Sequence, residues 1–253
     1  MVAPPVLWRD LRRFTPARVA LGRAGNGLPT AAHLEFQAAH AAARDAVHAE
    51  LDIDALAADL AAAGLSSQVV RSACPDRRTY LLRPDLGRRL ADGEADRLPA
   101  APGIAFVVCD GLSATAVQRH AAPLLAHVVP ALGQSGPVVI ARQGRVALGD
   151  GIGAALGADA VAVLIGERPG LSTPDSLGVY LTWQPHIGRS DAERNCISNI
   201  RPQGLPIPDA AAKLLWLIGA MRRLGLTGIA LKDEQPALPG HDPQKISTSV
   251  VTT

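Results

Sequence analysis

Short apolar runs alternate with helix-forming segments through much of this 253-residue chain, and this alternation constrains its fold most strongly. Residues 104–109 (IAFVVC) are continuously apolar, as expected of a strand that is buried on both faces of a parallel sheet. Further strands are expected at residues 68–73, 138–141, 160–165 and 177–183, and helices at 114–127, 148–156 and 209–224. This order predicts an α/β fold with a mostly parallel, Rossmann-like sheet and helices on both faces.

Weaker patterns complete the predicted organisation. Residues 79–82 and 228–231 are expected to form strands, and residues 84–90 a short helix. Residues 31–50 are rich in strong helix formers behind Thr30 as a cap, and a second helix is expected between Asp52 and Gly64. We therefore divide the chain into an N-terminal arm (1–14), a small helical module (15–67), an α/β domain (68–232) and a disordered C-terminal tail (233–253).

Composition excludes several classes of protein. A formal net charge of +2 gives no electrostatic argument for nucleic acid binding. The three cysteines (Cys74, Cys109 and Cys196) form no C-x-x-C pair, which favours a reducing compartment over a disulfide framework or a zinc site. No apolar run reaches the ~18 residues that a membrane span needs. We expect a cytoplasmic, soluble protein.

Two carboxylates follow predicted strands, where open α/β sheets bind their ligands. For Asp110 we prefer a role as the cap of the next helix, and a ligand contact stays open. For Glu167 we prefer a ligand contact, because Pro169 and Gly170 shape a loop that caps no obvious helix.

Two further residues have less distinctive surroundings. Val146 follows another strand and could line the same crevice, but a core valine is the better interpretation from sequence alone. Cys196 lies in a polar loop that we expect over residues 195–202, beside Arg194 but with no obvious base. A reactive thiol needs such a neighbour, so we prefer a small buried side chain, with ligand contact left open.

Common catalytic patterns are missing from the sequence. Residues 149–157 (GDGIGAALG) lack the G-x-G-x-x-G spacing, residues 22–27 follow no strand and lack a Walker lysine, and no G-x-S-x-G elbow occurs. His33, His40 and His48 have no carboxylate or cysteine that completes a metal set. We therefore expect a ligand-binding subunit with no catalytic residues and no metal site of its own.

Seven segments, in order, resemble the small (light) subunit of ethanolamine ammonia-lyase. The resemblance covers about residues 11–231, nearly the whole chain. The segments are TPARVALGRAGNGLPT (15–30), FQAAHAAARDAVH (36–48), YLLRPDLGRR (80–89), DGLSATA (110–116), ARQGRVALGD (141–150), LIGERPGLSTPDS (164–176) and NCISNIRPQG (195–204).

The resemblance implies a subunit of an adenosylcobalamin-dependent lyase that converts ethanolamine to acetaldehyde and ammonia. In that family a TIM-barrel large subunit carries the substrate site, and the small subunit helps to hold cobalamin at the interface of the hetero-oligomer. The family's cobalamin contacts map to Val146 in QGRVA, Glu167 in IGERPGL and Cys196 in CISNI. The D-x-H-x-x-G motif of domains that donate a histidine to cobalt is absent, so we expect no cobalt ligand.

Two departures from the family pattern bear on localisation and on the tail. Some relatives carry a longer N-terminal extension that directs them into a bacterial microcompartment, so encapsulation stays open, and the tail after Lys232 matches nothing in the family. A stand-alone α/β binding protein for another cofactor or metabolite is the alternative function.

Overall fold

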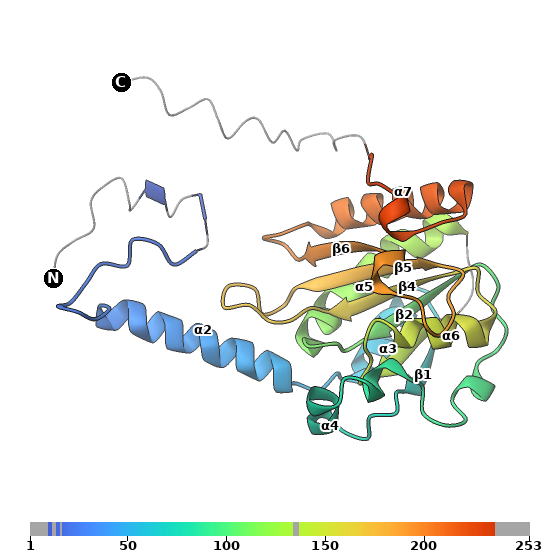
Figure 1. Cartoon of the computed structure of the whole chain (residues 1–253), viewed down its shortest axis with the longest axis horizontal. Helices are drawn as coiled ribbons and strands as arrows, with labels where there is room; N and C mark the ends of the chain where they lie inside the picture. The colour runs from blue at the N-terminus through green and yellow to red at the C-terminus, as the bar shows by residue number, and fades with distance from the viewer. Residues whose placement is uncertain (1–9, 12–13, 16, 134–136, 236–253) are drawn as a thin grey trace.

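The computed structural model describes residues 10–235 except 12–13, 16 and 134–136. In this part of the chain six strands form one sheet in the order β1-β3-β2-β4-β5-β6 (Figure 1). The strands are β1 (Ser67–Arg71), β2 (Ile104–Cys109), β3 (Val138–Arg142), β4 (Ala160–Gly166), β5 (Leu177–Trp183) and β6 (Arg194–Ile200). Strands β1, β3, β2 and β4 are parallel to one another, whereas β5 and β6 pair antiparallel at one edge.

The helices are α2 (Thr30–His48), α3 (Ile53–Ala62), α4 (Arg77–Leu82), α5 (Ala114–Leu132), α6 (Leu148–Leu156) and α7 (Ile207–Leu224). Both faces of the sheet are covered by helices. Helices α3, α5 and α7 contribute to one hydrophobic core, and α6 contributes to a second core on the opposite face. The predicted α/β class, with a mostly parallel sheet at its centre, is confirmed.

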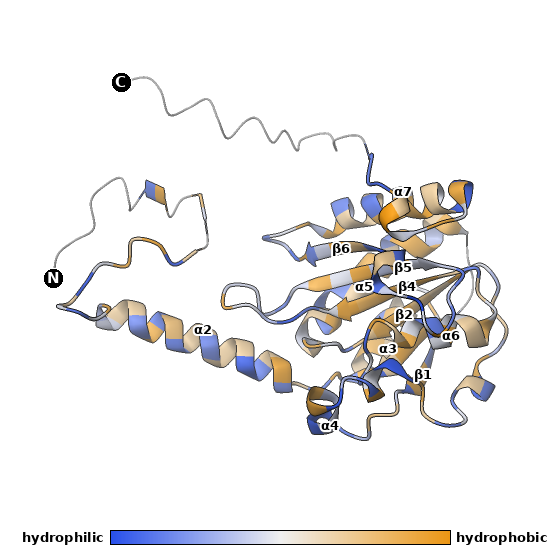
Figure 2. Ribbon diagram, viewed as in Figure 1, coloured by the Kyte–Doolittle hydropathy of each residue, from blue (hydrophilic) through white to orange (hydrophobic). Residues whose placement is uncertain are grey.

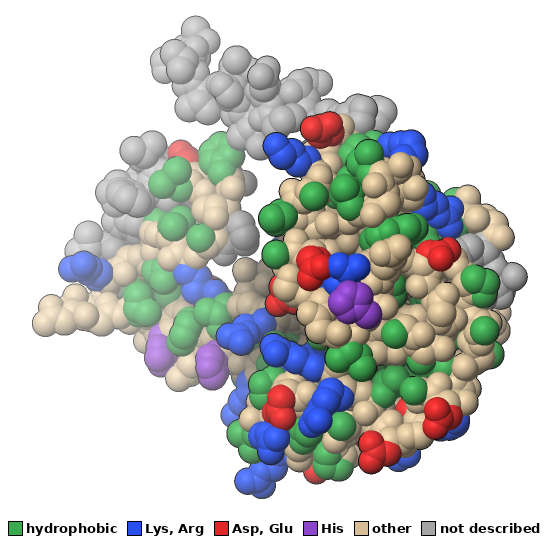
Figure 3. Space-filling model, turned by 45° about the vertical axis from the view of Figure 1, so that its right-hand side comes forward, with side chains coloured by type: hydrophobic (Ala, Val, Ile, Leu, Met, Phe, Trp, Pro, Cys, Tyr) green, Lys and Arg blue, Asp and Glu red, His purple; other side chains and the backbone are tan. Residues whose placement is uncertain are grey.

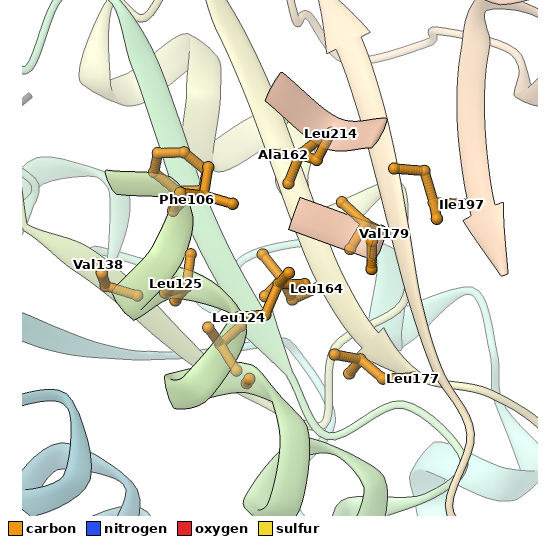
Figure 4. Close-up of a cluster of buried hydrophobic side chains, with 14 of the residues drawn as sticks. Phe106, Leu124, Leu125, Val138, Ala162, Leu164, Leu177, Val179, Ile197 and Leu214 are labelled. Atoms are coloured by element: carbon orange, nitrogen blue, oxygen red, sulfur yellow. The ribbon is translucent and has the colours of Figure 1, made fainter. Parts of the chain in front are cut away.

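The central strands are buried on both sides because their apolar side chains alternate between the two cores. Phe106 and Val108 of β2 enter the first core, while Val107 and Cys109 enter the second. Figure 4 shows Phe106 with Leu124 of α5 and other side chains of the first core. The hydropathy colouring in Figure 2 shows the central strands largely in orange, whereas the edge strands β1 and β6 carry blue, hydrophilic segments.

Three of the expected secondary-structure elements are wrong. Residues 79–82 belong to helix α4, because the Asp76 side chain accepts a hydrogen bond from the Thr79 N–H (2.7 Å) and caps the helix. Residues 228–230 form a 3₁₀ helix, and the Asn195 side chain bonds Gly228 and Leu231 in place of a neighbouring strand. Most of the loop expected at 195–202 is strand β6.

Helix α2 extends away from the sheet (Figure 1). Only Ala32 and Ala46 of this helix are buried, while Leu34 and Phe36 are exposed. Its N-cap is Pro29 and not Thr30, whereas the expected cap Asp52 of α3 is confirmed, with its Oδ1 3.0 Å from the Ala55 nitrogen. The proposed division into arm, helical module, α/β domain and tail stays a prediction, and residues 1–9 and 236–253 lie outside the described residues.

Charge is unevenly distributed over the surface. Figure 3 shows Lys and Arg side chains gathered at the lower left of the main body, and Asp and Glu spread over the rest of the visible face. The formal net charge is +2. None of the described helices is both long enough and apolar enough to span a membrane.

Candidate functional site

Three adjoining pockets lie at the carboxyl ends of β2, β3 and β4, the edge at which open α/β sheets bind ligands. Their volumes are about 560, 450 and 380 Å³. The middle pocket shares Leu112, Arg145 and Arg168 with the largest one, and Arg145, Val146 and Tyr180 with the smallest. We call this continuous depression the groove.

Loops that follow three different strands form the walls of the groove. Leu112 follows β2, Arg145 and Val146 follow β3, and Glu167 and Arg168 follow β4. At one end the groove reaches the C-terminal half of α2 through His40, Ala43, Arg44 and Val47. At the other end it reaches Arg88 and residues 189–191.

Glu167 is fixed at the start of the loop after β4. Its Oε1 accepts a hydrogen bond from Ser198 Oγ (2.6 Å), and its Oε2 accepts bonds from Ser176 Oγ (2.5 Å) and the Asn199 N–H (3.2 Å). A Cβ added to Gly178 would lie 3.0 Å from Glu167 Oε1, so the glycine leaves room for the carboxylate over β5. The side chain is half-buried in the wall of the middle pocket, and its contact with a ligand stays a prediction.

Val146 has both of the roles that the sequence left open. It packs against the second hydrophobic core, as a core valine would, but it is only half-buried. Its remaining surface lines the middle and the smallest pockets.

Cys196 is exposed on β6, so the expectation of a small buried side chain is wrong. It pairs with Tyr180 across β5 and β6, and Tyr180 lines two of the pockets. Partial desolvation and the negative charge of Glu167 raise the pKa of the Cys196 thiol. Arg194 does not lower it, because that guanidinium bonds both oxygens of the buried Asp150 (2.6 and 2.7 Å). A reactive thiolate is therefore not favoured at Cys196.

Asp110 does not cap the helix that follows it. Ser113 caps α5 through the Ala116 N–H, and the buried Asp110 instead binds the turn after β3. Asp110 Oδ1 accepts from the Gly144 N–H (3.0 Å), and Oδ2 accepts from the Gln143 N–H (3.1 Å). Burial raises the pKa of Asp110, and Arg77 and the backbone N–H groups oppose that rise. Asp110 thus positions the segment that carries Arg145 and Val146.

The sequence reasoning missed two tyrosines of the groove. Tyr80 and Tyr180 are the chain's only tyrosines, and both line the middle pocket. Their rarity in a chain with 3% aromatic residues was the available signal. Tyr80 and Tyr180 both came from segments interpreted as strands, so neither was connected with a ligand.

The geometry supports binding more than acid–base or nucleophilic chemistry. Val146, Glu167 and Cys196, which are far apart in the sequence, all lie beside Tyr180 or in pockets that it lines. Hydrogen-bond donors of its own chain hold the carboxylate of Glu167. Among the described residues, no histidine or carboxylate forms a hydrogen bond with the Cys196 thiol. In the same part of the chain, no group of three His, Cys, Asp or Glu residues is arranged to hold a metal ion.

Comparisons with known proteins agree on one family. The family model described as ethanolamine ammonia-lyase light chain matches residues 6–232. The ethanolamine ammonia-lyase small subunit of Azotobacter vinelandii is 55% identical over 238 residues, which cover 90% of this chain and 88% of the relative. That of Bradyrhizobium diazoefficiens is 52% identical over 250 residues, which cover 95% of both chains.

Proposed function

The chain belongs to the ethanolamine ammonia-lyase light-chain family, and from that membership we propose that it is the small subunit of an adenosylcobalamin-dependent ethanolamine ammonia-lyase. In this proposal it works in a hetero-oligomer with a TIM-barrel large subunit that carries the substrate site. The enzyme converts ethanolamine to acetaldehyde and ammonia. The small subunit contributes one wall of the cobalamin site.

One observation carries the proposal. Val146, Glu167 and Cys196 come from three separate segments, and the fold gathers them around Tyr180 at the carboxyl edge of the sheet. A carboxylate has roughly four lone-pair positions, of which Glu167 uses three for its own chain. The remaining position suits an amide N–H, the donor that the side chains around a corrin ring present.

The size of the groove supports a shared site. Enclosed pockets for drug-sized ligands measure roughly 300–1,000 Å³, and cobalamin is much larger than such ligands. The three pockets measure about 560, 450 and 380 Å³ and are open on one side. A groove of this kind fits one side of the cofactor, and the large subunit would enclose the other.

The cofactor supplies the radical chemistry when it is bound, through its cobalt–carbon bond. This chain would bind and orient it: Glu167 accepts a hydrogen bond, and Val146 and Tyr180 offer apolar surface. The raised pKa keeps the Cys196 thiol neutral, so that it makes a contact without acting as a nucleophile. No residue of this chain is assigned a catalytic role.

Helix α2 supports the existence of a partner. It extends from the sheet with Leu34 and Phe36 exposed, 56% and 39% respectively, and its C-terminal half borders the groove. Exposed apolar side chains that continue into a binding groove mark an interaction surface. We assign the large subunit to this surface.

Reconstitution tests the proposed function. The isolated chain, given ethanolamine and adenosylcobalamin, is expected to release no ammonia, and addition of a family large subunit should start the reaction. Continued inactivity with a large subunit that is active with its own partner would refute the proposal. Calorimetry on the isolated chain addresses the alternative, because tight ligand binding without any partner would indicate a stand-alone binding protein.

A further inference from the structure

Arg145 occupies the centre of the groove. It is the one residue, among those described, that lines all three pockets. It lies directly after the Gln143–Gly144 turn that Asp110 holds, and its own N–H donates to the Gly87 carbonyl (2.8 Å).

The side chain of Arg145 is held in one position by its neighbours. Its guanidinium carbon lies 4.2 Å from the centre of the Tyr80 ring, and Nη2 donates to the Tyr80 carbonyl (3.3 Å). Tyr80 is itself fully buried, and its hydroxyl donates to the Gly144 carbonyl (3.1 Å). A Cβ on Gly87 would lie 3.0 Å from Arg145 Cγ, so the glycine leaves space for the arginine stem.

The charge of Arg145 is uncompensated. Its Nε is buried with no hydrogen-bond partner, and no carboxylate of the described residues forms an ion pair with it. Two buried arginines differ in this respect, since Arg77 pairs with Asp110 and Arg194 pairs with Asp150. A fixed, partly desolvated guanidinium without a partner lowers the stability of a folded protein unless an anion binds to it.

Nearby acidic groups do not neutralise Arg145. Glu167, in the same pocket, accepts from Ser176, Ser198 and Asn199, and Asp191 at the far end pairs with Arg194. Arg88 and Arg168 are exposed and line parts of the groove. Neither forms an ion pair with an acidic side chain of the described residues, so the local charge is positive.

We propose that Arg145 is an anion-binding residue of the groove and that it takes the phosphodiester of the cofactor's nucleotide tail. This inference rests on the proposed function, because cobalamin carries one phosphodiester between its corrin side chain and its terminal base. A planar guanidinium matches the paired oxygens of such a group better than an ammonium does. Arg145 lies between Glu167, in the middle pocket, and Arg88, in the smallest pocket. We therefore place the nucleotide tail along the smallest pocket.

Binding measurements on the reconstituted complex test this assignment without relying on turnover. Adenosylcobalamin and adenosylcobinamide, which lacks the phosphodiester and the base, are titrated into complexes that contain wild-type chain, Arg145→Met or Arg145→Lys. Methionine keeps an unbranched stem against Tyr80 and removes the charge, and lysine keeps the charge without the planar fork. Arg223→Met, at the exposed end of α7 and outside the groove, is the matched control.

We expect Arg145→Met to weaken adenosylcobalamin binding about 10- to 100-fold, the range of a charge-assisted hydrogen bond. Binding of adenosylcobinamide should change less than about twofold, and Arg145→Lys should lie between wild type and Arg145→Met. Inorganic phosphate should compete with adenosylcobalamin on the wild-type complex and not on Arg145→Met.

Three results would overturn the assignment. Equal weakening for both corrinoids would show that Arg145 contacts the corrin or only supports the fold. No change for either would remove it from the site. Arg145→Met could instead weaken assembly with the large subunit and leave the ratio of adenosylcobalamin to adenosylcobinamide affinity unchanged. That result would show that a carboxylate of the partner pairs with Arg145. If the wild-type complex binds neither corrinoid, the proposed function itself fails.

Discussion

Asp110→Asn tests whether one buried carboxylate positions the groove. In the wild-type chain, Oδ1 accepts from the N–H groups of Gly111 (3.1 Å) and Gly144 (3.0 Å). Oδ2 accepts from the Gln143 N–H (3.1 Å) and from Arg77 Nη1 (3.4 Å). Asparagine has a single acceptor oxygen, which would take the place of Oδ1. Its NH₂ group would then face the Gln143 N–H and Arg77 Nη1, which are also donors. Two hydrogen bonds are lost, and one of them carries the charge of Arg77.

The expected cost follows from these contacts. Leaving one buried N–H unsatisfied costs about 1–3 kcal/mol. Breaking a buried ion pair by removing one charge costs about 3–5 kcal/mol. Arg77 retains hydrogen bonds to the Gly111 and Val47 carbonyls, which reduces its share of the cost. We therefore expect Asp110→Asn to lower the free energy of unfolding by about 3 kcal/mol.

Urea unfolding of the full chain, followed by circular dichroism, measures this change. The midpoint should fall while the slope with denaturant stays constant, because the same surface is exposed on unfolding. Asp85→Asn is the matched control, since Asp85 forms an exposed ion pair with Arg83 and its loss should hardly move the midpoint. If Asp110→Asn unfolds at the wild-type midpoint, Asp110 does not hold the Gln143–Gly144 turn, and the account of how Arg145 and Val146 are positioned is wrong.

Three further predictions concern the site and the sheet. Glu167→Ala should weaken cobalamin binding in the complex while the Michaelis constant for ethanolamine stays nearly unchanged; an unaltered cobalamin titration would remove Glu167 from the site. Asp150→Ala should lower the unfolding free energy by about 3 kcal/mol, because it leaves the buried Arg194 with only the exposed Asp191 as an acidic partner. Asp150→Leu combined with Arg194→Met should cost less, and equal losses in urea unfolding would contradict this. Burial lowers the pKa of the His120 imidazole below its value of 6.5 in the unfolded chain, so the folded state is favoured above pH 6.5 and loses this advantage as the pH falls. His120→Leu should therefore reduce the change in the free energy of unfolding between about pH 7 and pH 5. An unchanged slope with pH would exclude His120 as the cause.

Local patterns in the sequence carried much of the fold. The continuous apolar runs of β2 and β4 predicted buried parallel strands, and helix α6 has the predicted bounds 148–156. Strand β6 was missed because only Arg194, Ile197 and Ile200 of its seven residues are buried, so its polar residues resemble a loop. Residues 79–82 were misassigned because their strand-like composition was outweighed by the cap at Asp76.

The family was also available from the sequence, and the comparisons confirm it. The assignment of Val146, Glu167 and Cys196 to cobalamin came from the family motifs and stays a prediction. The structure adds that Val146 and Glu167 line the groove and that Cys196 pairs with Tyr180, which also lines it.

The sequence by itself determined the α/β class, the apolar strands and the family, because periodicity and long motifs are properties of neighbouring residues. Only the tertiary structure decided which side chains meet. Asp110 binds Arg77, 33 positions earlier in the chain, and Arg145 has no acidic partner among the described residues. Ion pairing and burial depend on distances across the fold, and spacing along the chain does not encode those distances. For that reason Asp110 could be mistaken for a helix cap, and Arg145 became visible as an unpaired charge only in the folded chain.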